Sequence, residues 1–168
     1  GYVTYAMPQV LQHRGFSMGE IGTMSALVSL PHAIKVGWAP ALDAGWRRRS
    51  WYIACVLLAG LGLAVTQLIP PDKDQHVTSW LTMMSLYTFA LSVSQFGAAT
   101  SSAAVDALMA TTLAPEKKDV AAGWGMAGNL GGTGMGGGLA MILTQSISAE
   151  ATAVMMAIAC LVCGLPAL

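Results

Sequence analysis

Long apolar stretches separated by short polar ones run along the chain. Residues 50–69 form a predominantly apolar run without a charged side chain, SWYIACVLLAGLGLAVTQLI. Residues 20–42 form a second apolar run, which Pro31, His32 and Lys35 interrupt. Because a helix of about 20 apolar residues crosses the ~30 Å hydrocarbon layer of a bilayer, each run predicts one membrane span.

The other apolar runs extend this pattern to both ends of the chain. Residues 80–113 exceed one bilayer crossing, so that helix must tilt or continue into water. Residues 1–12 are too short to cross and predict the end of a helix whose beginning is missing. Connections of about 4 to 10 residues leave no room for another domain, so the spans pack as one bundle. The predicted spans of this all-α membrane protein are 1–12 (partial), 20–42, 50–69, 80–113, 120–145 and 150–168.

The composition agrees with a lipid bilayer as the surroundings. Apolar residues make up 55% of the chain and charged residues 10%, against about 25% charged residues in an average soluble domain. Basic and acidic residues balance to a net charge of zero, so nothing points to a nucleic-acid partner. His13, His32 and His76 lack the spacing of metal ligands, and the sequence predicts neither a metal site nor a cofactor.

The positions of the charges predict the orientation. If the chain enters from the cytoplasm, the cytoplasmic connections hold five basic residues and the outer ones hold two, Arg14 and Lys73. Such a bias is typical of the positive-inside rule and predicts the orientation of a multi-pass protein, which we expect in the inner (cytoplasmic) membrane. Trp38, Trp46 and Trp51 cluster near the cytoplasmic boundary, where indole rings anchor helices. The five basic residues are Arg47, Arg48, Arg49, Lys117 and Lys118.

Two charged residues lie inside predicted spans at similar depth, Lys35 and Asp106. A central lysine costs about 2.5–3.5 kcal/mol on insertion, so it must snorkel, form an ion pair or face a wet cavity. The pair predicts a substrate or proton site in such a cavity. The alternative is that Lys35 snorkels and Asp106 forms a latch with Arg47 to Arg49. His32 shares the Lys35 face, either as a bundle residue or as a proton relay.

A glycine-rich stretch marks the fifth predicted span. It contains Gly-x-Gly-x-x-Gly, but the dinucleotide fingerprint needs a preceding strand, and none is predicted here. Gly128, Gly132 and Gly136 recur every four residues, which predicts a helix face that another helix can approach closely. Asn129 beside this face needs a hydrogen-bond partner and contacts either substrate or a neighbouring helix.

Two segments carry distinctive motifs at the ends of predicted spans. The first segment is Lys35-Val-Gly-Trp-Ala-Pro-Ala-Leu-Asp43, followed by Arg47-Arg-Arg. The second is Ala-Val-Asp106-Ala-Leu, then Leu113-Ala-Pro-Glu-Lys-Lys and a glycine-rich span ending Gly-Gly-Gly-Leu-Ala. These motifs and their order resemble those at the ends of the second and fourth spans in the major facilitator superfamily, and more narrowly in its branch of muropeptide permeases (AmpG) and acetyl-CoA transporters.

The resemblance implies that the chain is the N-terminal six-helix half of a twelve-span secondary transporter, with the C-terminal half as its partner. Such a permease moves a small or amphiphilic solute by alternating access, as a symporter with the proton as coupling ion. The resemblance assigns Asp43, Arg47, Arg48 and Arg49 to a cytoplasmic gate between the halves, and puts Lys35 and Asp106 near the cavity floor. Siderophore importers share part of the first motif, so a metal chelate is an alternative cargo.

Two other function classes remain as alternatives at this stage. An integral membrane enzyme would need a nucleophile, an acid–base pair or metal ligands at one depth, and the sequence predicts no catalytic residues. A non-transporting subunit of the same fold is the other alternative.

Overall fold

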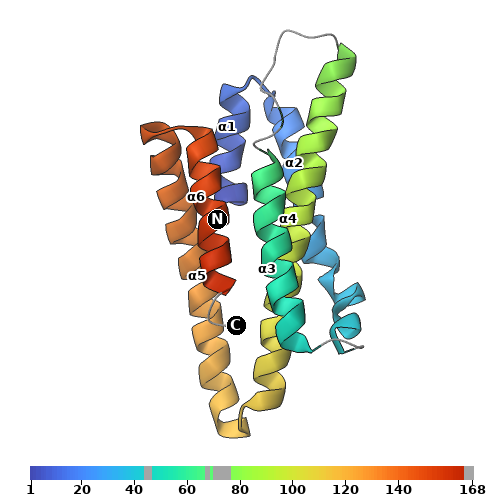
Figure 1. Cartoon of the computed structure of the whole chain (residues 1–168), viewed down its shortest axis with the longest axis vertical. Helices are drawn as coiled ribbons and strands as arrows, with labels where there is room; N and C mark the ends of the chain where they lie inside the picture. Colours follow the sequence, from blue (N-terminus) through green and yellow to red (C-terminus); the bar gives the residue numbers. More distant parts are fainter. Residues whose placement is uncertain (44–46, 67–68, 70–76, 165–168) are drawn as a thin grey trace.

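The structure, a computed structural model of the whole chain, describes residues 1–43, 47–66, 69 and 77–164. Within these ranges it contains α-, 3₁₀- and π-helices and no β-strand (Figure 1). The predicted all-α fold is therefore confirmed. In chain order the elements are η1 (Tyr2–Ala6), α1 (Met7–His13), α2 (Met18–Ile34), η2 (Lys35–Gly37), η3 (Ala39–Asp43), α3 (Arg48–Val65), α4 (Val77–Thr112), α5 (Pro115–Ser146) and α6 (Ala149–Gly164).

The two ends of the bundle are named here by one arginine each. The α1–α2 and α5–α6 connections lie at one end, called the Arg14 end (Figure 1). The α4–α5 connection and the start of α3 lie towards the other end, called the Arg48 end (Figure 1).

The α1–α2 turn shows how local chemistry sets a helix boundary. Gly15 has φ 86°, a left-handed conformation that only glycine adopts at little cost. Ser17 then caps α2: its hydroxyl accepts a hydrogen bond from the Glu20 amide at 3.3 Å, and the Glu20 carboxylate accepts one from the Ser17 amide at 2.7 Å. This reciprocal capping box satisfies amides at the helix start that have no partner inside the helix.

Helices α4 and α5 form a long hairpin. They contain 36 and 32 residues, so at 1.5 Å per residue they are about 54 and 48 Å long, more than a ~30 Å hydrocarbon layer. Pro115 starts α5, where its missing N–H costs nothing. The Glu116 to Asp119 segment, expected as a connection, is therefore the first turn of α5.

The second predicted span is not one α-helix. The predicted range was 20–42, but α2 ends at Ile34, and the 3₁₀ segments η2 and η3 follow it. Pro40 has no N–H to donate to the Val36 carbonyl, so an α-helix through this position would lack a hydrogen bond. Pro31, by contrast, lies inside α2, and the helix continues past it.

Helices α3 and α4 make the most extensive helix contact in the described bundle. A Cβ atom on Gly62 would lie 2.6 Å from the Ser94 amide nitrogen, and one on Gly97 would lie 2.5 Å from the Cys55 carbonyl oxygen. Ser94 Oγ also donates a hydrogen bond to the Ala59 carbonyl at 2.9 Å. Small residues on both helices therefore bring the two backbones together, as is common between membrane helices.

The glycine seam predicted on α5 is not a contact of this bundle. A Cβ atom on Gly128, Gly132 or Gly136 would meet no described atom within 4 Å. Gly137 makes the contact instead, because a Cβ there would lie 2.5 Å from Tyr5 Cδ2. Glycine at four-residue spacing permits close approach but does not require it, so a helix partner for this face stays a prediction.

The apolar core lies towards the Arg14 end. Its most enclosed large side chains are Tyr87, Met7 and Met24, which come from α4, α1 and α2.

Among the described helices, α3 is the one that is both long enough and apolar enough over its length to cross a membrane. The segment Glu150–Val162 in α6 is apolar but shorter. Large apolar side chains are exposed on the other helices too, including Phe89 at 70% and Trp124 at 76%.

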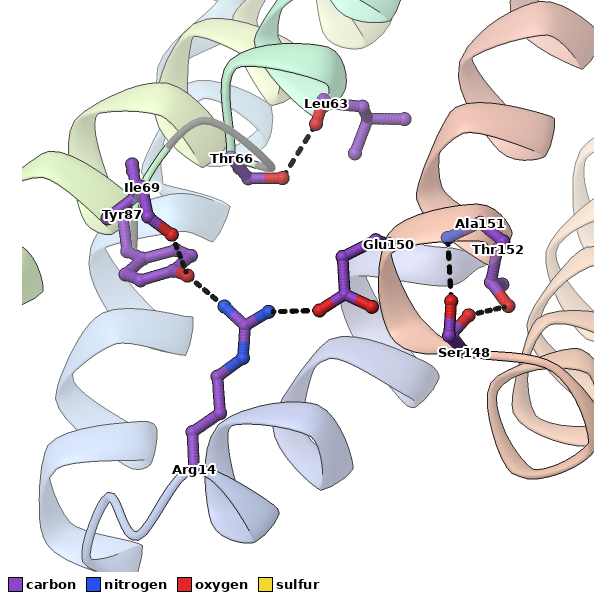
Figure 2. Close-up of polar contacts among 9 residues, drawn as sticks. All are labelled: Arg14, Leu63, Thr66, Ile69, Tyr87, Ser148, Glu150, Ala151 and Thr152. Carbon is purple, nitrogen blue, oxygen red and sulfur yellow. Dashed lines mark hydrogen bonds and ion pairs between the residues drawn. The ribbon is translucent and has the colours of Figure 1, made fainter. Parts of the chain in front are cut away.

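A polar cluster joins three helical regions at the Arg14 end. Arg14 donates hydrogen bonds to the Tyr87 hydroxyl and, at 3.2 Å, to Glu150 Oε1 at the start of α6 (Figure 2). The Tyr87 hydroxyl donates in turn to the Ile69 carbonyl at 3.2 Å (Figure 2). These bonds connect the α1–α2 turn with α4 and α6.

Candidate functional site

A cavity of about 600 Å³ lies between α4 and α5, with Lys35 from the end of α2 on its wall. Its polar lining residues come from three segments of the chain, and its other walls are mostly apolar. The polar residues are Lys35, Ser102, Asp106, Lys118 and Asn129, and the apolar ones include Met109, Ala110, Met126 and Leu130.

Helical spacing explains why these side chains share the cavity. Ser102 and Asp106 are four residues apart and lie on one face of α4. Lys118, Ala122 and Asn129 recur at intervals of about one and two turns and lie on one face of α5. The α4–α5 hairpin turns these two faces towards each other.

The structure brings together three of the four residues predicted for the substrate or proton pathway. Lys35 and Asp106 line the cavity together with Asn129. Lys35 is half-buried where α2 gives way to η2, and Asp106 and Asn129 are exposed. Neither the Lys35 nor the Asp106 side chain forms an ion pair or hydrogen bond with a described residue, so the two charges share the cavity without pairing directly.

His32, the fourth predicted residue, lies outside the cavity lining. Its Nε2 atom is 3.1 Å from Gln95 Oε1 on α4. Since an amide oxygen only accepts, the imidazole nitrogen is the donor. The bond joins α2 to α4, the interaction expected of a bundle residue.

The predicted latch between Asp106 and the arginines does not form in the described structure. Arg48 Nη1 donates instead to the Ala107 carbonyl at 3.0 Å and to the Thr111 hydroxyl. Arg48 thus binds the end of α4 one residue beyond Asp106. Arg47 and Arg49 are exposed at the start of α3, and the side chain of Asp43 lies outside the described part of the chain.

Trp38, predicted as a boundary anchor, contacts α4 through both its indole N–H and its ring. Its indole N–H donates to Thr100 Oγ1 at 3.1 Å, and its ring lies against Phe96 with centroids 4.8 Å apart. It thereby joins η2 to α4, and it lines a second cavity of about 700 Å³ between α2 and α4. The predicted anchor Trp46 lies outside the described residues.

Lys118 and Ser102 are cavity residues that the sequence reasoning missed. The apolar pattern places Lys118 in a connection, because the fifth span is predicted to start at residue 120. The spacing of Lys118, Ala122 and Asn129 is the signal that could have identified this face. No group of three or more His, Cys, Asp or Glu side chains able to hold a metal ion occurs among the described residues.

The comparison with protein families agrees with this architecture. The family model of the major facilitator superfamily matches residues 1–168, the whole chain. No solved structure matches the chain. With its six-helix bundle, the chain therefore belongs to the major facilitator superfamily, a family of multi-pass membrane proteins that act as secondary transporters.

Proposed function

We propose that this chain is the N-terminal bundle of a proton-coupled permease similar to the muropeptide transporters. It moves a small or amphiphilic solute across the inner (cytoplasmic) membrane by alternating access, and it is not an enzyme. The observation that carries the proposal is the cavity in which Lys35, Asp106 and Asn129 occur together. Ionisable residues within membrane helices mark substrate and ion pathways, because placing a charge in the bilayer costs free energy that a purely structural residue would not need.

Asp106 is the proposed proton-binding residue. Its carboxylate is exposed in the cavity and forms no ion pair with a described residue, so it is accessible to water. The cavity also holds the positive charge of Lys35, so the net charge of the cavity would become more positive when Asp106 takes up a proton. Proton binding would therefore change how the cavity holds a charged solute.

The proposed gate lies at the Arg48 end. Arg48 already fixes the start of α3 to the end of α4 through Ala107 and Thr111. Arg47 and Arg49 remain exposed beside it and, with Asp43, would contact a C-terminal six-helix half when the cavity closes at the cytoplasmic side. The open glycine face of α5, which carries Gly128, Gly132 and Gly136, is the proposed packing surface for that half.

Uptake by reconstituted protein tests this function. The full-length protein in proteoliposomes, with an imposed proton gradient, should accumulate a labelled muropeptide. Lys35→Ala and Asp106→Asn should each abolish accumulation while membrane insertion is retained, and Lys117→Gln, whose side chain does not line the cavity, should behave as the native protein. Unchanged uptake in both cavity variants would refute the site assignment.

Other outcomes of the same assay separate the alternatives. Accumulation of an iron–siderophore chelate in place of the muropeptide would identify a siderophore importer. Chemical conversion of the solute without accumulation would identify a membrane enzyme. Neither accumulation nor conversion of either solute would favour a non-transporting subunit.

A further inference from the structure

We propose that the α4–α5 cavity selects an amphiphilic anion, a molecule with a carboxylate or phosphate head and an apolar body. This inference rests on the proposed transport function and names the class of solute that the same cavity takes. It is carried by the charges on the cavity wall and by their position relative to the apolar lining.

The charged groups of the cavity sum to a positive value. Lys35 and Lys118 contribute two ammonium groups, and Asp106 contributes one carboxylate. None of the three side chains forms an ion pair or hydrogen bond with a described residue, so no group of the described chain is paired with these charges. An anionic head group between the two lysines would supply the missing partner, whereas a cation would add to the repulsion.

On α5, the large apolar lining residues lie farther from the Arg48 end than Lys118. Lys118 is in the first turn of α5, and Met126 and Leu130 follow about two and three turns later on the same cavity wall. Both apolar side chains are largely exposed, at 70% and 69%. A solute with its head near Lys118 would lay its apolar body along these side chains. A purely polar sugar would leave them in contact with water.

Ser102 and Asn129 add polar groups that carry no charge. A hydroxyl and a carboxamide can donate to and accept from uncharged polar groups on the body of the solute. Methionine at positions 109 and 126 provides flexible, polarizable walls that adapt to different apolar shapes. Selection therefore depends on the charge of the head group more than on the shape of the body.

Equilibrium binding of matched amphiphiles tests the inference. The probe is labelled dodecyl phosphate, the comparison is dodecyltrimethylammonium, and the full-length protein is held in nanodiscs of zwitterionic phosphatidylcholine. Dodecyl phosphate should bind saturably and more tightly than the ammonium compound. Lys35→Gln and Lys118→Gln should each weaken its binding about tenfold, the effect of losing one charge-assisted contact.

Three further variants control for folding and position. Lys118→Arg keeps the charge and should retain binding. Lys117→Gln removes a neighbouring charge that does not line the cavity and should leave binding unchanged. Asp106→Asn removes the opposing carboxylate and should tighten binding of dodecyl phosphate. Equal binding of the two amphiphiles, or full binding by Lys118→Gln, would overturn the inference.

A change of nanodisc lipid separates a solute from a membrane head group. If anionic phosphatidylglycerol displaces dodecyl phosphate in proportion to its mole fraction, the cavity holds a lipid head group and the assignment to a solute fails. Muropeptide uptake that is unaffected by Lys118→Gln would overturn the anion inference and leave transport standing. Charge-selective binding without uptake of any bound anion would overturn the proposed transport function and leave the anion inference standing.

Discussion

At the scale of single residues, Arg14 connects more of the bundle than any local sequence pattern indicates. Its side chain is 14% exposed, and it lies 5.5 Å from the centre of the Tyr87 ring as well as bonding to the Tyr87 hydroxyl. Glu150 accepts a second bond from the same guanidinium. Since hydrogen bonds to charged groups contribute more than neutral ones, Arg14 stabilises the joint between α4 and α6.

Replacing Arg14 should therefore destabilise the bundle. Arg14→Gln should lower the free energy of unfolding by about 1.5–3 kcal/mol, because it removes a charged donor from the buried Tyr87 hydroxyl. Thermal unfolding in detergent measures this, with Lys117→Gln as an exposed control. Combining Arg14→Gln with Tyr87→Phe should cost less than the sum of the single variants, and strict additivity would show that the contact contributes nothing.

The residues that sequence reasoning found at this scale are those with a clear energetic cost. Lys35 and Asp106 were predicted as a pair because charges within a span need a reason, and they share the cavity. Arg14 and Glu150 were missed as partners because 136 positions separate them in the sequence. Arg48 bonds to a backbone carbonyl, an acceptor that every residue carries and that no motif reveals.

At the scale of helices, the α3–α4 contact depends on the absence of side chains. Gly62 on α3 lies against the backbone of Ser94, and Gly97 on α4 lies against that of Cys55 and Ala59. The backbone groups at this contact cannot move aside as the end of a flexible side chain can. Even one methyl group must therefore push the two helices apart.

Gly62→Ala should destabilise the bundle by about 1–3 kcal/mol, the usual cost of overpacking. Gly22→Ala provides the matched control, since Gly22 is exposed in the interior of α2 and an added Cβ meets no described atom within 4 Å. That variant should be neutral or stabilising by up to about 1 kcal/mol, because alanine favours helix. Comparing the two melting temperatures checks the prediction. Equal melting temperatures would mean that the helices separate freely at Gly62.

The lengths of the apolar runs predict where the helices lie along the chain, but they do not predict where each helix begins and ends. The predicted run 50–69 corresponds to α3, Arg48–Val65, because hydropathy over a full span outweighs individual residues. The end of α2 at Ile34 could not be read from the apolar run, because the run continues to Leu42 while the backbone changes to 3₁₀ segments after Ile34. The sequence shows the glycine spacing on α5, but it does not identify the helix that packs there, because glycine permits a close approach without selecting a partner.

At the scale of the whole molecule, the bundle is built differently at its two ends. The apolar core and the Arg14 cluster tie the helices together at one end. At the other end a short turn joins α4 to α5, from which the two helices separate around the cavity (Figure 1), and α5 is largely exposed between Val120 and Met135. The tightly packed Arg14 end suits a rigid body that moves as a unit. The cavity and the exposed part of α5 suit contact with a second half of the transporter.

The glycine face of α5 should therefore matter for transport and not for folding of the bundle. Gly125 lines the cavity, and Gly128 and Gly132 follow it at three- and four-residue spacing, so the open face adjoins the cavity wall. A helix of the C-terminal half packed there would close the cavity. Gly132→Leu should not lower the melting temperature, but it should lower solute uptake about tenfold or more, because overpacking costs about 1–3 kcal/mol in the closed state. Ala127→Leu, on the other side of α5 at roughly 100° of rotation per residue, should keep native uptake.

Two results would contradict this prediction. Native uptake by Gly132→Leu would show that the second half packs elsewhere. A lower melting temperature in Gly132→Leu than in Ala127→Leu would show that the glycine face already has a partner within this bundle.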